Sequence, residues 1–341
     1  MATAPPDINS ATDACRRFSC ICVAEWKAGR DTLPAVQSQQ RPGPPGPYAM
    51  PDEILAPVSD RATGGVRYAD VEYARVMGYR PLRMDLLLPA TPSIPVPVVV
   101  WIHGGGWLFG SRLHGPGTEP VCRALLERGL AVALVEHRFS GEAHFPACLH
   151  DIKAAVRWLR RFGASVGING AAIGVWGVSS GGHLAALMAM SGTDDRPDEP
   201  LDQRLEGTVG ATGWSSNVAA AVAWCAPTDF LALGPDRTGW PDPGTPEALL
   251  IGGPTRERRQ DAAFASPVSH VHTGAAPILL VHGLQDDLIP AQQSALLHQA
   301  LQAVGATSEL EWIDGAGHAF FGVDPDPIAR RSADFLARHL A

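Results

Sequence analysis

The chain has 341 residues, of which 45% are hydrophobic and 18% charged, so it can bury a large core as one α/β domain or two smaller ones. Its formal net charge of −8 argues against nucleic acid or an anionic membrane as a partner, because both require clustered Lys and Arg. No apolar run approaches the roughly 18 residues that span a bilayer. The short apolar run 18–24 follows acidic residues and does not form a usable signal peptide. We therefore expect a soluble, cytoplasmic protein.

The 6 cysteines could in principle form disulfides. Cys122, Cys148 and Cys225 lie within apolar helical or strand patterns, where a free cysteine behaves as a small buried hydrophobic residue. The others, in the stretch 15–22, match neither zinc nor thioredoxin spacing. The sequence therefore predicts free cysteines, and no motif indicates a metal site or a cofactor.

Residues 1–62 form a leader that carries no catalytic signature. It includes the run 41–47 (RPGPPGP), which is expected to be extended and to form neither helix nor sheet. The leader is either a disordered arm or a strap over a catalytic domain that occupies residues 63–341. A strand-like stretch at 82–88 is expected to open the folded part.

From there the chain alternates short apolar, β-branched runs with helical patterns, which is typical of a parallel sheet with crossover helices. Most runs are apolar almost throughout, as expected for strands that are covered on both faces. The expected strands are 96–102, 130–135, 172–178, 219–224, 277–281 and 308–313, and the expected helices are 151–162, 291–304 and 327–340. Two polar excursions rich in Pro and Gly, 191–217 and 233–262, interrupt the alternation. Long loops of this kind often form lids or binding loops.

Residues 177–181 (GVSSG) place a serine where the expected strand gives way to a helix of small residues. A strand that turns directly into a helix imposes strained φ and ψ angles on its central residue and crowds the positions two before and two after. Gly177 and Gly181 relieve that crowding, so Ser179 is the candidate nucleophile. Ser180 would offer its backbone N–H at the positive end of the helix. The alternative is a glycine-rich turn that only packs.

Residues 103–107 (HGGGW) follow the expected strand 96–102. Consecutive glycines let backbone N–H groups converge on one oxygen without interference from Cβ atoms, and such donors stabilise a tetrahedral oxyanion. Gly105 and Gly106 are the preferred donors, and Gly104 is a further candidate. His103 is expected to brace the loop. A phosphate site is not indicated, because no Lys-Ser/Thr follows the glycines.

The general base and its acid partner are expected late in the chain. His318 lies in residues 314–320 (DGAGHAF), directly after an expected strand and between small residues that let its ring swing in. The acid should follow another strand end, and the loop after 277–281 offers Asp286, with Asp287 as the alternative.

The chain order Ser179, Asp286, His318 is the order expected of an α/β-hydrolase fold. In that arrangement His318 takes the proton from Ser179 as it attacks an ester carbonyl, and Asp286 holds the tautomer of the imidazole. His183 competes for the role of base, but its position on the helix after Ser179 favours packing.

With these motifs, residues 64–341 resemble the esterase group of the α/β-hydrolases that includes the feruloyl/acetyl-xylan esterases and the arylformamidases. They resemble the hormone-sensitive-lipase-like carboxylesterases more distantly. The resemblance implies a mostly parallel sheet with helices on both faces and a metal-free serine esterase whose triad is Ser179, Asp286 and His318. The sequence departs from the pattern at His137, where a Tyr is common before the Arg of this region.

Three aromatic residues, Trp107, Trp214 and Phe320, lie beside the catalytic loops and could line the acyl or alcohol site. Ordinary packing in the core or at its rim is the alternative. We expect a carboxylesterase for small to medium acyl esters, whose partner is a small-molecule substrate. The same residues could hydrolyse an aryl-formyl amide or a peptide bond, or belong to a non-catalytic ligand-binding protein. Whether the chain is a monomer or a homo-oligomer stays open.

Overall fold

The computed structural model describes residues 57–59, 65–90, 95–192, 203–233 and 244–341. All of them belong to one compact unit, Pro44–Ala341. Of the predicted leader, only residues 57–59 are described, so the choice between an arm and a strap falls outside the described residues. The same holds for the parts of the two predicted lid segments that are not in these ranges.

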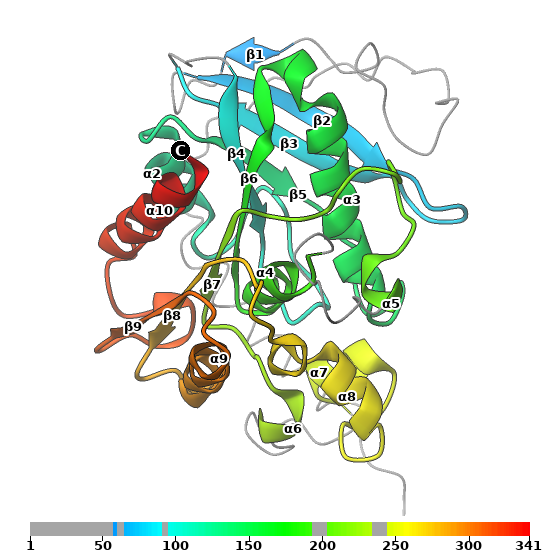
Figure 1. Ribbon diagram of the computed structural model, residues 1–341, viewed down its shortest axis with the longest axis vertical. Coiled ribbons are helices and arrows are strands. Elements are labelled where there is room, and N and C mark those ends of the chain that lie inside the picture. Colours follow the sequence, from blue (N-terminus) through cyan, green and yellow to red (C-terminus); the bar gives the residue numbers. More distant parts are fainter. Residues whose placement is uncertain (1–56, 60–64, 91–94, 193–202, 234–243) are drawn as a thin grey trace, which may run out of the picture. The chain divides into compact units, whose positions relative to one another are not determined.

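The described residues form one nine-stranded sheet with the order β1-β2-β3-β5-β4-β6-β7-β8-β9 (Figure 1). The pairs from β1 to β3 and the pair β3/β5 are antiparallel, and every pair from β5/β4 onward is parallel. The strands are β1 (Val58–Ser59), β2 (Val66–Ala74), β3 (Leu82–Leu88), β4 (Val96–Ile102), β5 (Ala131–Val135), β6 (Ile168–Val178), β7 (Ala220–Trp224), β8 (Ile278–Gly283) and β9 (Ser308–Ile313). The mostly parallel sheet that the sequence predicts is therefore confirmed.

Each predicted run is a strand, although β6 begins at Ile168, a few residues before the predicted start. The prediction that residues 82–88 open the folded part is wrong, because β1 and β2 precede them in the sheet. Strand β2 pairs antiparallel with β3 in a register that sets Val66 opposite Leu88. The first five residues of β2 are only half-buried and include polar residues. The sequence of β2 therefore lacks the continuous apolar pattern that marks a strand covered on both faces.

Helices cover both faces of the sheet, as predicted. Along β4, Val98 and Val100 point to one face while Val99 and Trp101 point to the other, since successive side chains alternate in a strand. Figure 1 shows α3 and α10 on opposite sides of the strands. The first face is covered by α3 (Ala147–Phe162), α4 (Ser180–Met190) and α9 (Gln292–Ala303), and the second by α2 (Thr118–Leu126) and α10 (Asp326–Leu340).

The helices also show where sequence patterns fall short. Helix α3 begins at Ala147, before the predicted start at 151, and α2 was not predicted. Helix α2 is short and carries Pro120 in its first turn, where proline is tolerated but weakens a periodic pattern. The shorter helices are α5 (Gln203–Glu206), α6 (Phe230–Leu233), α7 (Pro246–Ile251), α8 (Arg259–Ala265) and the 3₁₀ turns η3 (Gly163–Val166), η4 (Pro267–His270) and η5 (His318–Phe320).

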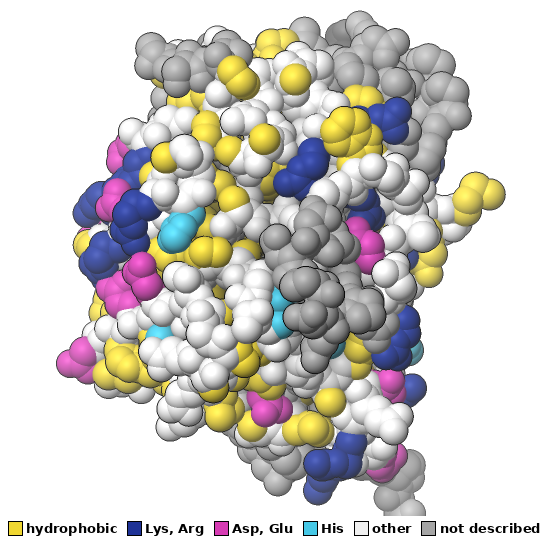
Figure 2. Space-filling view, viewed as in Figure 1, with side chains coloured by type: hydrophobic (Ala, Val, Ile, Leu, Met, Phe, Trp, Pro, Cys, Tyr) yellow, Lys and Arg dark blue, Asp and Glu magenta, His cyan; other side chains and the backbone are white. Residues whose placement is uncertain are grey.

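Ion pairs join the two helices of the second face near the surface. Arg123 of α2 contacts Asp326 of α10 at 2.6 Å, and Arg128, just after α2, contacts Asp334 at 2.6 Å. Figure 2 shows acidic and basic side chains next to one another on the side where these helices lie. Within the described part of the chain, no helix combines the length and the apolar character needed to cross a bilayer.

Candidate active site

The candidate residues come from loops that follow parallel strands. The carboxyl ends of β4, β6, β7 and β8 meet at one edge of the sheet, because these strands are parallel neighbours. Residues 103–107 follow β4, Ser179 follows β6, Asp286 follows β8 and His318 follows β9. The fold thus directs four separate pieces of the sequence to one region.

Ser179 lies on the turn between β6 and α4 with φ 57° and ψ −121°. A Cβ atom on Gly177 would lie 2.1 Å from the carbonyl oxygen of Gly181, and one on Gly181 would lie 2.1 Å from that of Ile102. No side chain fits at either position. The strained serine and the need for two glycines are therefore confirmed.

His318 connects Ser179 to Asp286. Its Nδ1 lies 2.8 Å from Oδ2 of Asp286, and its Nε2 lies 2.9 Å from Oγ of Ser179. An ionised carboxylate can only accept, so Nδ1–H donates to Asp286 and the neutral Nε2 accepts from the Ser179 hydroxyl. The Asp286 side chain is fully buried, whereas that of His318 is 19% exposed and so reachable from solvent.

Asp286 is held by several donors. Its Oδ1 accepts backbone N–H groups of Leu288 and Ile289 at 3.0 and 2.8 Å. Burial by itself would raise the pKa of Asp286, but hydrogen bonds from His282 and His318 outweigh it and hold the pKa well below its usual value. The carboxylate is thus ionised when it faces His318. The alternative acid, Asp287, is exposed.

The loop after β4 places its glycines against the serine. An added Cβ on Gly104 would lie 3.3 Å from the Cβ of Ser179, and one on Gly105, whose φ is 127°, would lie 2.0 Å from the carbonyl oxygen of Phe109. Among the described residues, none accepts a hydrogen bond from the backbone N–H of Gly105, Gly106 or Ser180. Free N–H groups beside a reactive hydroxyl are the arrangement that an oxyanion needs.

His103 braces this loop, as the sequence predicts. Its Nδ1 lies 2.7 Å from the carbonyl oxygen of Gly104, and its ring stacks on His137 at 4.8 Å between centroids. Burial lowers the pKa of both histidines, that of His137 to about 3, so the stacked pair is neutral.

Two of the aromatic residues predicted for the pocket are in the core. Trp107 is 2% exposed and packs edge-on against His183 and Phe230, with centroids 5.0 and 5.5 Å apart. Phe320 is also 2% exposed and packs against Trp224 at 4.9 Å. Their positions favour the packing alternative.

Trp214 is 44% exposed and lies in a loop that is held against α3, which favours packing at the rim of the core. Its neighbours Ser215 and Asn217 accept hydrogen bonds from Arg160, near the end of α3. Ser216, between these two residues, has its Oγ 3.1 Å from Nζ of Lys153, in the first half of α3. The loop then enters β7 at its amino end.

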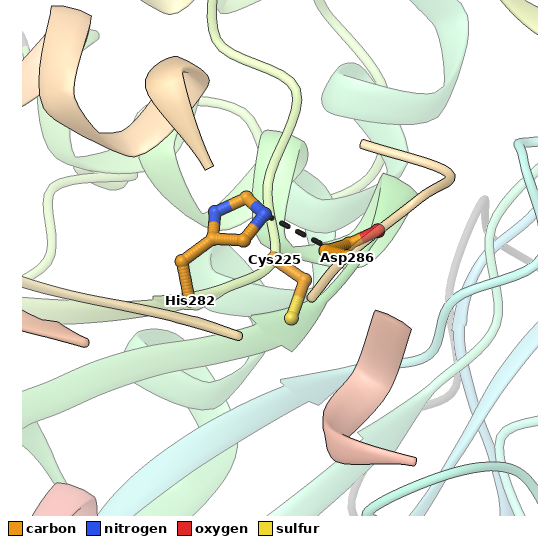
Figure 3. Close-up of side chains that lie close together, drawn as sticks. All are labelled: Cys225, His282 and Asp286. Carbon is orange, nitrogen blue, oxygen red and sulfur yellow. Dashed lines mark ion pairs between the residues drawn. The ribbon is translucent and has the colours of Figure 1, made fainter. Parts of the chain in front are cut away.

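One group of metal-ligating side chains occurs among the described residues: Cys225, His282 and Asp286, whose ligand atoms lie within 4.8 Å of one another (Figure 3). The His282 nitrogen that faces Asp286 also lies 2.9 Å from the carbonyl oxygen of Ile289. A cation there would have to displace both contacts. The sequence analysis missed His282; its only signal was a histidine four positions before the acid.

The comparisons with known sequences give a matching family model and named relatives. A BD-FAE family model matches residues 84–301. Two relatives from Mycobacterium tuberculosis (strain ATCC 25618 / H37Rv) are Esterase LipC, 28% identical over 72% of this chain and 59% of its own length, and Esterase LipQ, 29% identical over 72% of this chain and 56% of its own. The chain spans little more than half the length of these curated relatives.

Solved structures of similar fold are also esterases by name. A truncated form of a carbohydrate esterase from gut microbiota has a TM-score of 0.72 and 28% identity, over 82% of this chain and 98% of that one. The thermophilic esterase Est2 of the Planctomycetes species Thermogutta terrifontis has a TM-score of 0.58 and 27% identity, over 82% and 91% of the two chains. With the sheet described above, these likenesses confirm the α/β-hydrolase fold.

Proposed function

The chain belongs to the BD-FAE family, and from that premise we propose that it is a serine carboxylesterase for small to medium acyl esters. The observation that carries the proposal is the pair of hydrogen bonds that join Ser179, His318 and Asp286, at 2.9 and 2.8 Å. A nucleophile, a base and an orienting carboxylate in this relation activate a hydroxyl for attack on an acyl carbon.

The proposed reaction has two halves. His318 accepts the proton of Ser179 as Oγ attacks the ester carbonyl, and it then gives that proton to the departing alcohol. Water next attacks the acyl-enzyme, with His318 again as base, and the acid product leaves. Asp286 stays ionised throughout and stabilises the imidazolium that forms in each half.

In both halves the carbonyl oxygen becomes an oxyanion. We assign its donors to the backbone N–H groups of Gly105, Gly106 and Ser180, with Gly104 as a further candidate. Ser180 is the first residue of α4, so the positive end of that helix adds to its N–H. Removing one donor of this kind typically lowers turnover by about 10²- to 10³-fold.

The substrate class follows from the site and the relatives. The residues assigned to the reaction select an acyl carbon and do not choose the leaving group. Because the chain is similar to a carbohydrate esterase, acetylated sugars are candidate substrates besides simple esters. Aryl formamides and peptides are the alternative substrates.

The test compares wild type with Ser179→Ala on p-nitrophenyl acetate, butyrate and octanoate and on an acetylated sugar. We expect turnover in the wild type and a loss on the order of 10⁶-fold in the variant. Ser180→Ala is the matched variant. Because it keeps the backbone N–H, its turnover is expected to fall by less than about tenfold, which corresponds to about 1.4 kcal/mol. Activity that survives in folded Ser179→Ala contradicts the assignment, and an inactive wild type directs the search to formamides and peptides.

A further inference from the structure

Asp286 lies between two histidines, of which the reaction above uses one. His282 is the second-last residue of β8, and its side chain is fully buried. Its Nε2 lies 3.2 Å from Oδ2 of Asp286 and 2.9 Å from the carbonyl oxygen of Ile289 (Figure 3). A carbonyl and a carboxylate only accept, so this nitrogen carries a hydrogen, which it shares between the nearer carbonyl oxygen and, as a second and longer contact, the carboxylate.

The other ring nitrogen of His282 is also engaged. Its Nδ1 lies 2.8 Å from Oγ of Ser294, a fully buried residue of α9. Because the carbonyl oxygen of Ile289 can only accept, it places the ring hydrogen on Nε2, and Nδ1 then accepts the hydroxyl hydrogen of Ser294. Helix α9 thereby holds the ring from the side opposite the carboxylate.

The two histidines meet on the same carboxylate oxygen. Oδ2 of Asp286 accepts from His318 and from His282, while Oδ1 accepts from two backbone N–H groups. A carboxylate held at both oxygens cannot rotate about its last bond without breaking contacts. The direction in which Oδ2 faces His318 is therefore set in part by His282.

We propose that His282 is a positioning residue for the reaction: its Nε2–H fixes the Asp286 oxygen that orients His318, and the carbonyl oxygen of Ile289 fixes the tautomer of His282. This inference rests on the proposed function, since it assigns His282 a role through Asp286. By sharing Oδ2, the His282 donor also moderates the pull of the carboxylate on the His318 proton. Removing that donor concentrates charge on Oδ2 and favours the imidazolium form of His318.

The charged and titratable groups around Asp286 come from three elements. His282 comes from β8, His318 from η5, and Cys225 follows β7, with its thiol beside the carboxylate. Burial, with a smaller effect of Asp286, raises the pKa of Cys225 to about 12. The thiol is therefore neutral and adds no charge, and Asp287, next in the chain, is exposed to solvent.

The test uses two substitutions of His282 in the full chain and measures kcat/KM for p-nitrophenyl acetate against pH. His282→Leu keeps most of the volume and removes the donor. We expect a kcat/KM plateau roughly 10- to 100-fold lower, as for the loss of a hydrogen bond to a charged group. We also expect the midpoint of the acid limb to move to higher pH. His282→Gln places an amide N–H near Nε2 and should recover most of the plateau and the wild-type midpoint.

Ser294→Ala and His298→Leu complete the set. Ser294→Ala removes the hydroxyl that holds Nδ1 of His282 but leaves the Ile289 contact, so it should shift the midpoint in the same direction as His282→Leu, by a smaller amount. His298 is the matched control, because it also lies against a serine hydroxyl, with Nδ1 2.8 Å from Oγ of Ser308, but on the side of α9 that faces β9. His298→Leu should leave the plateau and the midpoint unchanged.

A proton NMR measurement separates this inference from the proposed function. The hydrogen between Nδ1 of His318 and Asp286 should give a resonance far downfield, and it should move in His282→Leu but not in His298→Leu. This readout needs no substrate, so it decides the role of His282 even if no ester is hydrolysed. The inference is overturned if folded His282→Leu keeps that resonance, or if His282→Leu and His282→Gln have the same pH profile.

Discussion

The two segments that interrupt the α/β alternation have different anchors in the structure. Residues 191–192 and 203–217 of the first are described, and the stretch 203–217 is held by charge: Glu206 contacts Nζ of Lys153 at 2.8 Å and a guanidinium nitrogen of Arg157 at 2.6 Å. Both cations belong to α3 and are at most 2% exposed. This segment runs along α3, from His150 near the start of the helix, whose Nε2 lies 2.7 Å from the carbonyl oxygen of Arg204, to Arg160 near its end.

The described part of the second segment and the residues that follow it, 244–265, are held by neutral contacts at the active-site edge. The N–H of Phe145 donates to the carbonyl oxygen of Leu250 at 2.9 Å, and Nε2 of His183 donates to that of Ala265 at 2.7 Å. A Cβ on Gly106 would lie 3.4 Å from Pro246, so α7 begins directly against the loop that carries the candidate oxyanion donors. The second segment thus contacts the loop that carries the candidate oxyanion donors directly, whereas the first reaches this region through Arg204, whose guanidinium lies 4.2 Å from the ring centroid of Phe264.

The largest expected effect comes from breaking the charged anchor. Glu206→Gln removes the carboxylate that both buried cations contact, which should lower the free energy of unfolding by about 3–5 kcal/mol. The kcat/KM of the folded fraction should stay at the wild-type value, because Glu206 is anchored on α3 and not on the loops that carry Ser179, Asp286 and His318. Urea unfolding and esterase assays on the same preparation measure both quantities.

Asp261→Asn is the control for that change. Its ion pair with Arg258 belongs to the second segment, and both side chains are about half exposed, at 50% and 45%. An exposed pair of this kind contributes about 1 kcal/mol or less. If Glu206→Gln costs as little as Asp261→Asn, or lowers kcat/KM of the folded enzyme, the contrast between the two anchors fails.

The neutral anchor should respond to pH. Burial is the main cause that lowers the pKa of His183 from 6.5 to about 4 in the folded chain. Between these values the unfolded chain binds a proton that the folded chain does not. The contribution of His183 to the free energy of unfolding is therefore fully present above pH 6.5. It declines as the pH falls toward 4, by roughly 3 kcal/mol in total.

His183→Gln tests this dependence, since a glutamine can donate to the carbonyl oxygen of Ala265 and does not titrate. We expect the variant to be less stable than the wild type near pH 7 and the difference to narrow as the pH falls to 4.5, in urea titrations at each pH. His137, whose pKa burial lowers to about 3, keeps part of the slope in both proteins. Parallel slopes would show that His183 does not carry the effect.

The sequence predicts features that depend on neighbouring residues, and it misses features that depend on contacts between segments far apart in the chain. The strained Ser179 follows from Gly177 and Gly181, because the clash lies within one turn. The approach of α7 to Gly106 and the place of Trp214 beside α3 depend on contacts between distant segments, which leave no periodic signal. For the same reason a sequence scan treats the two excursions alike, although their anchors differ.

The smallest expected effect compares two glycines, one against each segment. Gly106 has φ 61° and faces Pro246, and Gly210 has φ 76° with an added Cβ 3.0 Å from that of Ala154. Alanine at a left-handed position costs roughly 1–2 kcal/mol, so Gly106→Ala and Gly210→Ala should lose similar amounts of stability. Only Gly106→Ala should lower kcat/KM, by about tenfold if the shifted peptide weakens one oxyanion contact by about 1.4 kcal/mol. Equal kcat/KM values for the two variants would mean that α7 and the oxyanion loop are not coupled, and that the second segment is as remote from catalysis as the first.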